Sequence, residues 1–160
     1  MGAGGAGVAR SNWTKPGARL GLDTAVFIYY LNRQEPYFSL CQGILKRIEN
    51  GEAHGVISTV SEMEMLVQPL AANDKPVIEA IHDLLDTLEH LDIVPVDRQL
   101  ARNAAQVRAQ TRLRNIDALI VATAIVSGCD ALVGNDETCA RRVREIRYIY
   151  LDDAVKEGTP

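Results

Sequence analysis

The sequence has few of the residues that thiol or zinc chemistry needs, and it has no long apolar run. Its three cysteines, Cys41, Cys129 and Cys139, show no C-x-x-C spacing and do not cluster with the three histidines. This pattern predicts free thiols in a reducing compartment, without a motif for zinc or for a cysteine–histidine nucleophile. No apolar run reaches the roughly 18 residues of a membrane-spanning helix, and no secretory signal opens the chain. We therefore expect a cytoplasmic protein without membrane contact.

The composition is typical of one globular domain. The chain has 160 residues, of which 47% are apolar and 24% charged, a balance that allows a sizeable core. Residues 1–17 are rich in Gly and Ala without helical or strand period, and they are interpreted as a flexible N-terminal tail. The domain itself is expected to span residues 18–153, and residues 154–160 are expected to form a short C-terminal tail.

Short apolar runs alternate with segments of helical period. The expected strands are Ala18–Leu22, Gly55–Ile57, Ile93–Val96, Ala131–Val133 and Arg147–Leu151. The expected helices are Thr24–Leu31, Ser39–Glu49, Val60–Gln68, Pro76–His90, Arg98–Arg112, Ile116–Ser127 and Glu137–Arg144. Pro69 is expected to end the third of these helices, because proline lacks the backbone donor. The alternation favours a single three-layer α/β/α domain with a central, mostly parallel five-stranded sheet.

Four acidic residues lie where an expected apolar segment meets the start of a helix. They are Asp23, Glu64, Asp117 and Asp136. The carboxyl ends of parallel strands meet at one edge of the sheet, where such folds bind ligands. Asp23 follows the first strand, Asp136 follows the fourth, and the helices that carry the other two begin at the same edge. Because a buried carboxylate is costly unless it is paired, protonated or bound to a metal, the pattern predicts a shared metal site.

Each of these acids also has a simpler explanation. Asp23 and Asp136 are good helix caps, and Asp117 lies in a first turn, where it would interact with the helix dipole. Glu64 fits a capping box that begins at Ser61. Taken singly, capping is the better interpretation of Asp23 and of Glu64. Four such coincidences at one edge nevertheless favour the shared site.

Two glutamates on the same helix have to be distinguished. Val60, Met63 and Val67 are interpreted as the apolar stripe that faces the core, which places Glu64 beside that stripe and Glu62 on the other side. Glu62 also fits a capping box of its own. We therefore predict that Glu64 points inward and belongs to the acidic site.

The segments that carry the four acids resemble the acidic motifs of the PIN-domain nucleases. The segments are Leu22–Ile28, Ser61–Leu66, Ile116–Ala124 and Val133–Asp136. They are most similar to those of VapC-type toxins of prokaryotic toxin–antitoxin pairs. The match runs from Ala18 to about Leu151 in the order and spacing of the family, and D-A-L-I-x-A-T-A is its most specific part.

The resemblance implies RNA cleavage that depends on Mg²⁺ or Mn²⁺, a small antitoxin partner and a homodimer. It also implies that the four acids are the catalytic metal ligands, with Thr24 and Asn135 as small polar neighbours. An all-carboxylate set suits these hard cations better than zinc. Three positions depart from the pattern: Ala25 stands where Asn is common, Gly134 where Thr or Ser is common, and Ile116 where Pro is frequent. None of these departures removes a carboxylate.

Positive charge is concentrated in the last third of the chain. The formal net charge is -4, but residues 98–147 contain nine Arg and no Lys against five acids, whereas residues 48–97 contain one Lys and eleven acids. Arg141, Arg142 and Arg144 follow Asp136 closely and are the first choice for contacts to RNA phosphates. The next choice is one face of the helix after Asp97, formed by Arg98, Arg102, Arg108 and Arg112. An ordinary solvated face explains this second set equally well.

Two other functions remain open at this point. A phosphatase with Asp23 as its nucleophile is one alternative, although the sequence lacks the second acid two residues later that such enzymes usually carry. A non-catalytic binding module that acts only through partners is the other. Metal-dependent RNA cleavage, release of phosphate from small molecules, and neither activity would distinguish the three.

Overall fold

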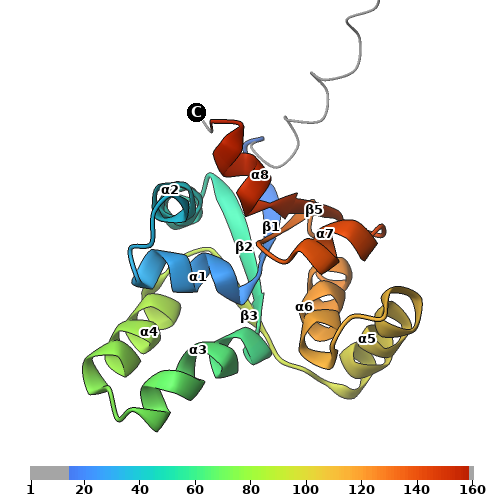
Figure 1. The fold of residues 1–160 in the computed structure, drawn as a ribbon, viewed down its shortest axis with the longest axis horizontal. Helices are drawn as coiled ribbons and strands as arrows, with labels where there is room; N and C mark the ends of the chain where they lie inside the picture. Colours follow the sequence, from blue (N-terminus) through green and yellow to red (C-terminus); the bar gives the residue numbers. More distant parts are fainter. Residues whose placement is uncertain (1–14, 159–160) are drawn as a thin grey trace, which may run out of the picture.

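A five-stranded sheet forms the centre of the computed structural model, which describes residues 15–158 (Figure 1). The strands are β1 (Ala18–Leu22), β2 (Ala53–Ser58), β3 (Leu91–Val94), β4 (Ala131–Gly134) and β5 (Arg147–Tyr150). They lie in the order β3-β2-β1-β4-β5, and every neighbouring pair is parallel. The predicted fold class is confirmed, and the sheet is parallel throughout.

The order of the strands reverses beside β1. The chain builds β1, β2 and β3 outward in one direction and then returns to place β4 and β5 on the other side of β1. Leu22 at the end of β1 is paired with Val133 near the end of β4. In parallel sheets a crevice opens at such a reversal, at the carboxyl ends of the two strands. Asp23 and Asp136 directly follow this point.

Helices cover both faces of the sheet. They are α1 (Thr24–Leu31), α2 (Tyr37–Glu49), α3 (Thr59–Ala71), α4 (Lys75–Thr87), α5 (Arg98–Thr111), α6 (Asn115–Val126), α7 (Glu137–Arg142) and α8 (Leu151–Lys156). Side chains of α1, α2 and α4 share one apolar core with β1, whereas those of α5 and α6 form a second core. Successive side chains of β4 point to opposite faces of the sheet and so pack into both cores. Ala131 and Val133 belong to the first core, and Leu132 belongs to the second.

Helix α6 lies directly against β1. A Cβ atom at Gly21 would be 2.7 Å from the Cβ of Ala124, so glycine is needed for this close approach. Most of α6 is buried, including Ala118, Val121 and Ala122. Because α6 is the crossover helix that precedes β4, it begins at the carboxyl edge of the sheet. Its first turn therefore brings Asp117 to the same edge as Asp23.

Several predicted boundaries were wrong. Helix α3 continues through Pro69 to Ala71, because a proline in the last turn removes only one hydrogen bond of a helix that is about to end. Helix α7 ends at Arg142 instead of Arg144, since Val143 is extended and turns its side chain into the core. The expected helix to His90 ends at Thr87, and β3 occupies Leu91–Val94 in place of the predicted 93–96.

The ends of the chain differ from the prediction in one respect. Helix α8 was not predicted, and it runs to Lys156, inside the segment interpreted as a C-terminal tail. Most of the expected N-terminal tail lies outside the described residues, but the N–H of Gly17 donates to the carbonyl of Glu52 at 2.8 Å. Over residues 15–158, no helix is both long and apolar enough to span a membrane.

Candidate functional site

Asp23 is fixed at the junction of two strands and a helix. Its backbone N–H donates to the carbonyl of Val133 at 2.9 Å, which ties the end of β1 to β4. Its side chain caps α1, with Oδ1 2.7 Å from the N–H of Thr24. The capping role considered for Asp23 is therefore real. It does not exclude a second role, because the carboxylate still faces the crevice.

The four predicted acids are close enough to act on one another. Burial, as the largest cause, and the charges of Glu64, Asp117 and Asp136 together raise the pKa of Asp23 to about 7, against the opposing effect of the Thr24 backbone hydrogen bond. Like charges raise one another's pKa only when they are near and poorly screened. The structure thus brings together residues from β1, α3, α6 and the end of β4.

Thr24 connects α1 with α3. Its hydroxyl donates to Oε1 of Glu64 at 2.8 Å, and Thr24 itself is only 6% exposed. This hydrogen bond fixes the direction of the Glu64 carboxylate toward Asp23. The sequence prediction that Thr24 is a polar neighbour of the acids agrees with this geometry.

The reason given for choosing Glu64 was nevertheless wrong. Met63 and Val67, interpreted as part of the inward stripe, are 49% and 57% exposed, and the buried positions of α3 are Ser61 and Met65. Glu64 lies beside this buried pair and so still reaches the crevice. The predicted capping boxes do not open the helix either, because α3 begins after Ser58, whose hydroxyl accepts from the N–H of Val60.

Asp117 is paired with an arginine that sequence reasoning missed. Arg114 Nε donates to Oδ2 of Asp117 at 2.8 Å, although the arginine side chain is 82% exposed. The hydrogen bond and charge of Asp117 raise the pKa of Arg114, and the charges of Asp136 and Glu64 contribute in the same direction. Arg114 therefore lies within the field of the acidic site. Its position three residues before Asp117, at the start of α6, is the signal that could have identified it.

Asp136 and Asn135 point in different directions. Asp136 caps α7, with Oδ1 2.8 Å from the N–H of Cys139. Asn135 turns toward α8: its amide donates to the hydroxyl of Tyr29 at 2.9 Å, and its carbonyl accepts from the N–H of Asp152 at 2.9 Å. Asn135 therefore anchors the loop that carries Asp136.

The carboxylate of Asp152, beside Asn135, accepts further hydrogen bonds from two tyrosines. The hydroxyl of Tyr150 donates to its Oδ2 at 3.1 Å, and the hydroxyl of Tyr37 donates to its Oδ1. The ring of Tyr37 stacks on that of Tyr29, with centroids 4.3 Å apart. The network joins α1, α2, β5 and α8 behind the acidic site, and no local sequence pattern predicts it.

Tyr148 occupies the space beside Gly134. A Cβ atom at Gly134 would collide with the Tyr148 hydroxyl and would lie 3.0 Å from both Cβ and Oδ2 of Asp23. The hydroxyl oxygen accepts from the N–H of Asp136 at 3.0 Å. Burial raises the pKa of Tyr148 well above its ordinary value, so the hydroxyl keeps its proton. The absence of a Thr or Ser side chain at Gly134 is thus compensated by a hydroxyl from β5.

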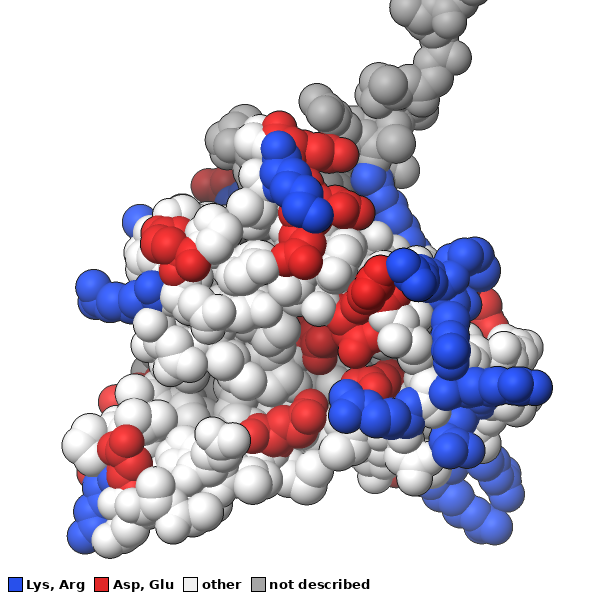
Figure 2. Space-filling view, viewed as in Figure 1, with Lys and Arg blue, Asp and Glu red and all other residues white. Residues whose placement is uncertain are grey.

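Basic side chains flank the acids on one side. Figure 2 shows acidic side chains in a hollow at the middle of one face and basic side chains over the neighbouring region of α5, α6 and α7. Arg141 pairs with Glu137 on the surface of α7. Arg142 donates to the carbonyl of Thr111 at 3.3 Å, and Arg144 to that of Val143 at 3.0 Å. The last two arginines therefore reach toward α5 and the loop after α7, where they bind backbone carbonyls and not the four acids.

The acidic residues fit a hard divalent cation by their chemistry. All four offer only carboxylate oxygens, the donors that Mg²⁺ and Mn²⁺ prefer. The raised pKa of Asp23 reflects its burial first and repulsion by the three neighbouring acids second, and a bound cation would relieve this repulsion. Within the part of the chain that the structure describes, however, no three Asp, Glu, His or Cys side chains already enclose a common ion position. Each of the four acids instead accepts a hydrogen bond from a protein donor: Glu64 from the Thr24 hydroxyl, Asp117 from Arg114, and Asp23 and Asp136 from the backbone N–H groups that they cap.

Comparison with known proteins identifies the family. The PIN domain matches residues 21–146, which include all four acids, and the chain belongs to this family. No curated protein matches the chain.

Solved toxin–antitoxin structures share the fold. A toxin–antitoxin complex from Klebsiella pneumoniae has a TM-score of 0.62 at 16% identity, covering 84% of this chain and 98% of that one. FitAcB from Neisseria gonorrhoeae gives 0.61 at 17%, covering 83% and 97%. VapBC2 from Rickettsia felis, bound to a DNA fragment from its promoter, gives 0.58 at 19%, covering 82% and 98%.

Replacing Asp23 with Asn is expected to remove a pH dependence of stability. The pKa of Asp23 is about 7 in the folded protein and 3.8 in its ordinary state, so between these values the folded state binds more protons than the unfolded chain. Raising the pH through this window then lowers the free energy of unfolding, by at most about 1.4 kcal/mol for each pH unit. Urea unfolding in EDTA should show this decline across the window in the wild type and a flatter profile in Asp23→Asn.

Asp97→Asn is the matched control for this experiment. Asp97 also caps a helix, with Oδ1 2.7 Å from the N–H of Leu100, but it lies at the start of α5. Asn caps helices about as well as Asp, so neither substitution should disturb the helix start. A decline of equal size in Asp23→Asn and the wild type would contradict the burial of this carboxylate among like charges.

Gly134 and Tyr148 are expected to be energetically coupled. Gly134→Ala forces a methyl group against the Tyr148 hydroxyl and should lower the free energy of unfolding by about 1–3 kcal/mol. Tyr148→Phe removes the hydroxyl, so the alanine should cost less in the double variant, with a coupling of about 1 kcal/mol. Gly43→Ala is the control, because its Cβ would meet nothing within 4 Å. Additive effects of the two substitutions, measured by urea unfolding, would show that the hydroxyl does not fill this space.

Proposed function

We propose that this protein is a metal-dependent endoribonuclease that hydrolyses RNA phosphodiester bonds and is the toxin of a type II toxin–antitoxin pair in the cytoplasm. The observation that carries the proposal is the burial of Asp23 beside Glu64, Asp117 and Asp136 at the carboxyl edge of the sheet, in a chain of the PIN domain family. Several carboxylates held close together repel one another and lower the stability of the fold. Binding a divalent metal for phosphodiester hydrolysis is a function that explains why they are kept together.

The four acids would hold Mg²⁺ or Mn²⁺. Such an ion polarises the phosphate, lowers the pKa of the attacking water and stabilises charge on the leaving oxygen. Thr24 keeps the Glu64 carboxylate oriented through its hydrogen bond of 2.8 Å. Asp136 has one oxygen committed to the N–H of Cys139, which leaves the other for the site.

Arg114 would bind the RNA backbone. In the structure its guanidinium is paired with Asp117, and 82% of the side chain is exposed. Once Asp117 serves as an ion ligand, this guanidinium is free to form charge-assisted hydrogen bonds with an incoming phosphate. Because Arg114 would exchange Asp117 for a phosphate only when the ion is bound, binding of the ion would be coupled to binding of the RNA.

An antitoxin partner is supported by the structural neighbours, several of which are toxin–antitoxin complexes. Exposed apolar side chains on α3, namely Met63, Val67 and Leu70, offer a surface for such a partner or for the second copy of a homodimer. The acidic hollow would attract a basic side chain of the antitoxin, and charge complementarity of this kind speeds association.

RNA cleavage by variants of α3 and α6 tests the nuclease proposal. Glu64→Gln and Asp117→Asn should each reduce cleavage of a structured RNA panel in Mg²⁺ or Mn²⁺ by about a hundredfold or more, because each removes a ligand. Glu62→Gln, on the same helix as Glu64, should cleave like the wild type, and EDTA should abolish activity. Full activity in Asp117→Asn, or loss in Glu62→Gln alone, would reject the assignment. Phosphate release from p-nitrophenyl phosphate without RNA cleavage would favour the phosphatase.

Expression in a bacterial host tests the toxin proposal. The wild-type chain should arrest growth, Asp23→Asn should not, and co-expression of the small gene adjacent to this one should restore growth. Immunoblots should show equal amounts of the two chains, so that the difference reflects activity. A host that grows normally with abundant wild-type protein would argue for a binding module instead.

A further inference from the structure

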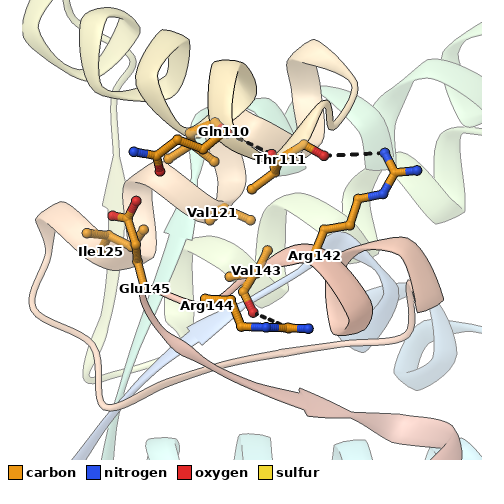
Figure 3. A pocket seen from close by; sticks show the side chains of 9 residues that line it. Gln110, Thr111, Val121, Ile125, Arg142, Val143, Arg144 and Glu145 are labelled. Atoms are coloured by element: carbon orange, nitrogen blue, oxygen red, sulfur yellow. Dashed lines mark hydrogen bonds between the residues drawn. The ribbon is translucent and has the colours of Figure 1, made fainter.

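A small cavity lies between α5, α6 and the loop that follows α7 (Figure 3). Its volume is about 170 Å³. Val107, Val121 and Val143 are buried and form its apolar base, while Gln110 and Arg142 stand at its rim. The cavity is therefore apolar at its base and polar at its opening.

A second depression continues the first along α5. It has a volume of about 220 Å³ and shares Val107, Gln110 and Ile125 with the first. Asn103 and Gln106 extend its lining, so that three amide side chains follow one another along the same face of α5. We call the two depressions together the α5–α6 groove.

The chemistry of the α5–α6 groove suits unpaired nucleobases. A base has apolar faces that stack on side chains and an edge that both donates and accepts hydrogen bonds. Amide side chains also donate and accept, which lets them pair with base edges. Each depression is smaller than the pockets of about 300–1,000 Å³ that bind drug-sized ligands. A row of amides above an apolar base is also a poor match for the continuous apolar stripe of a partner helix.

Charge around the groove favours RNA further. Arg142 and Arg144 lie at its end and are exposed, with Glu145 as the acidic residue among the lining side chains. Each guanidinium group donates through one nitrogen to a backbone carbonyl, and its remaining N–H groups are available as donors for phosphate. A nucleotide needs this combination of a cation for its phosphate and a polar-rimmed apolar site for its base.

The groove is also close to the acids along α6. Val121 and Ile125 follow Asp117 on the same helix, about 6 and 12 Å further along its axis at 1.5 Å per residue. Arg114 lies at the start of that helix, and Arg142 lies at the end of α7, whose N-cap is Asp136. Arginines therefore stand at both ends of the route from the acids to the groove.

We propose that the α5–α6 groove binds unpaired bases of the RNA beside the cleaved bond and thereby selects the sequence that is cut. This inference rests on the proposed nuclease function. Asn103, Gln106 and Gln110 read the base edges, the valine and isoleucine side chains pack against the base faces, and Arg142 and Arg144 hold the phosphates.

Binding of RNA with and without bases tests the groove directly. Labelled single-stranded RNA of mixed sequence is compared by fluorescence anisotropy, in EDTA, with a ribose-phosphate strand of equal length that lacks bases. The wild type should bind the base-containing strand about tenfold more tightly. Gln106→Ala combined with Gln110→Ala should reduce this ratio to near one. Gln99→Ala, on α5 outside the groove, should preserve it.

Cleavage of a random RNA library in Mg²⁺ separates this inference from the nuclease function. Sequenced ends should show a base preference near the cut in the wild type and in Gln99→Ala, and a flatter preference in the double variant. If the double variant cleaves RNA with an unchanged base preference, the proposed role of the groove is wrong and the proposed nuclease function still holds. Base-dependent binding without any cleavage would support the groove and reject the nuclease. Equal binding of both strands by the wild type would contradict base binding by the groove. A double variant that loses only antitoxin binding would contradict it as well.

Discussion

Asp23 is half-buried between the ends of β1 and β4, and the rest of the site depends on how its carboxylate is held there. An ionised carboxylate in such a place is destabilising, and three more acids face it. The backbone fixes its position from two sides, through the carbonyl of Val133 and the N–H of Thr24. The apolar cores on the two faces of the sheet must supply the stability that the site itself removes. The residues that stabilise the fold are thus separate from those of the acidic site.

The sequence allows prediction of those parts of the site that lie next to a strand end. Asp23 and Asp136 could be placed because each follows an apolar run, and the parallel arrangement follows from the alternation of runs and helices. Asp117 could be placed because its helix runs back to the start of the fourth strand and therefore begins at the carboxyl edge. For these residues, the local pattern and the tertiary position have the same cause.

Other residues reach the site through space, and no local pattern reveals them. Tyr148 is contributed by β5 and meets Gly134 only because β4 and β5 are paired. The inward face of α3 was predicted wrongly, because an apolar stripe normally faces the core. In this helix the apolar residues Met63 and Val67 face outward. Helix α8 has only six residues, too few to show a helical period.

The contacts of Asp152 and Tyr148 have a consequence for the order in which the chain becomes structured during synthesis. Both residues lie after the four acids in the chain, in β5 and α8, yet they hold the loop that carries Asp136. A nascent chain that ends before residue 147 already contains all four acids but lacks the two residues that fix this loop. Because chains emerge from the amino end, the acidic centre reaches its final geometry only after residue 152 has been added. Translation itself therefore delays the appearance of the finished site.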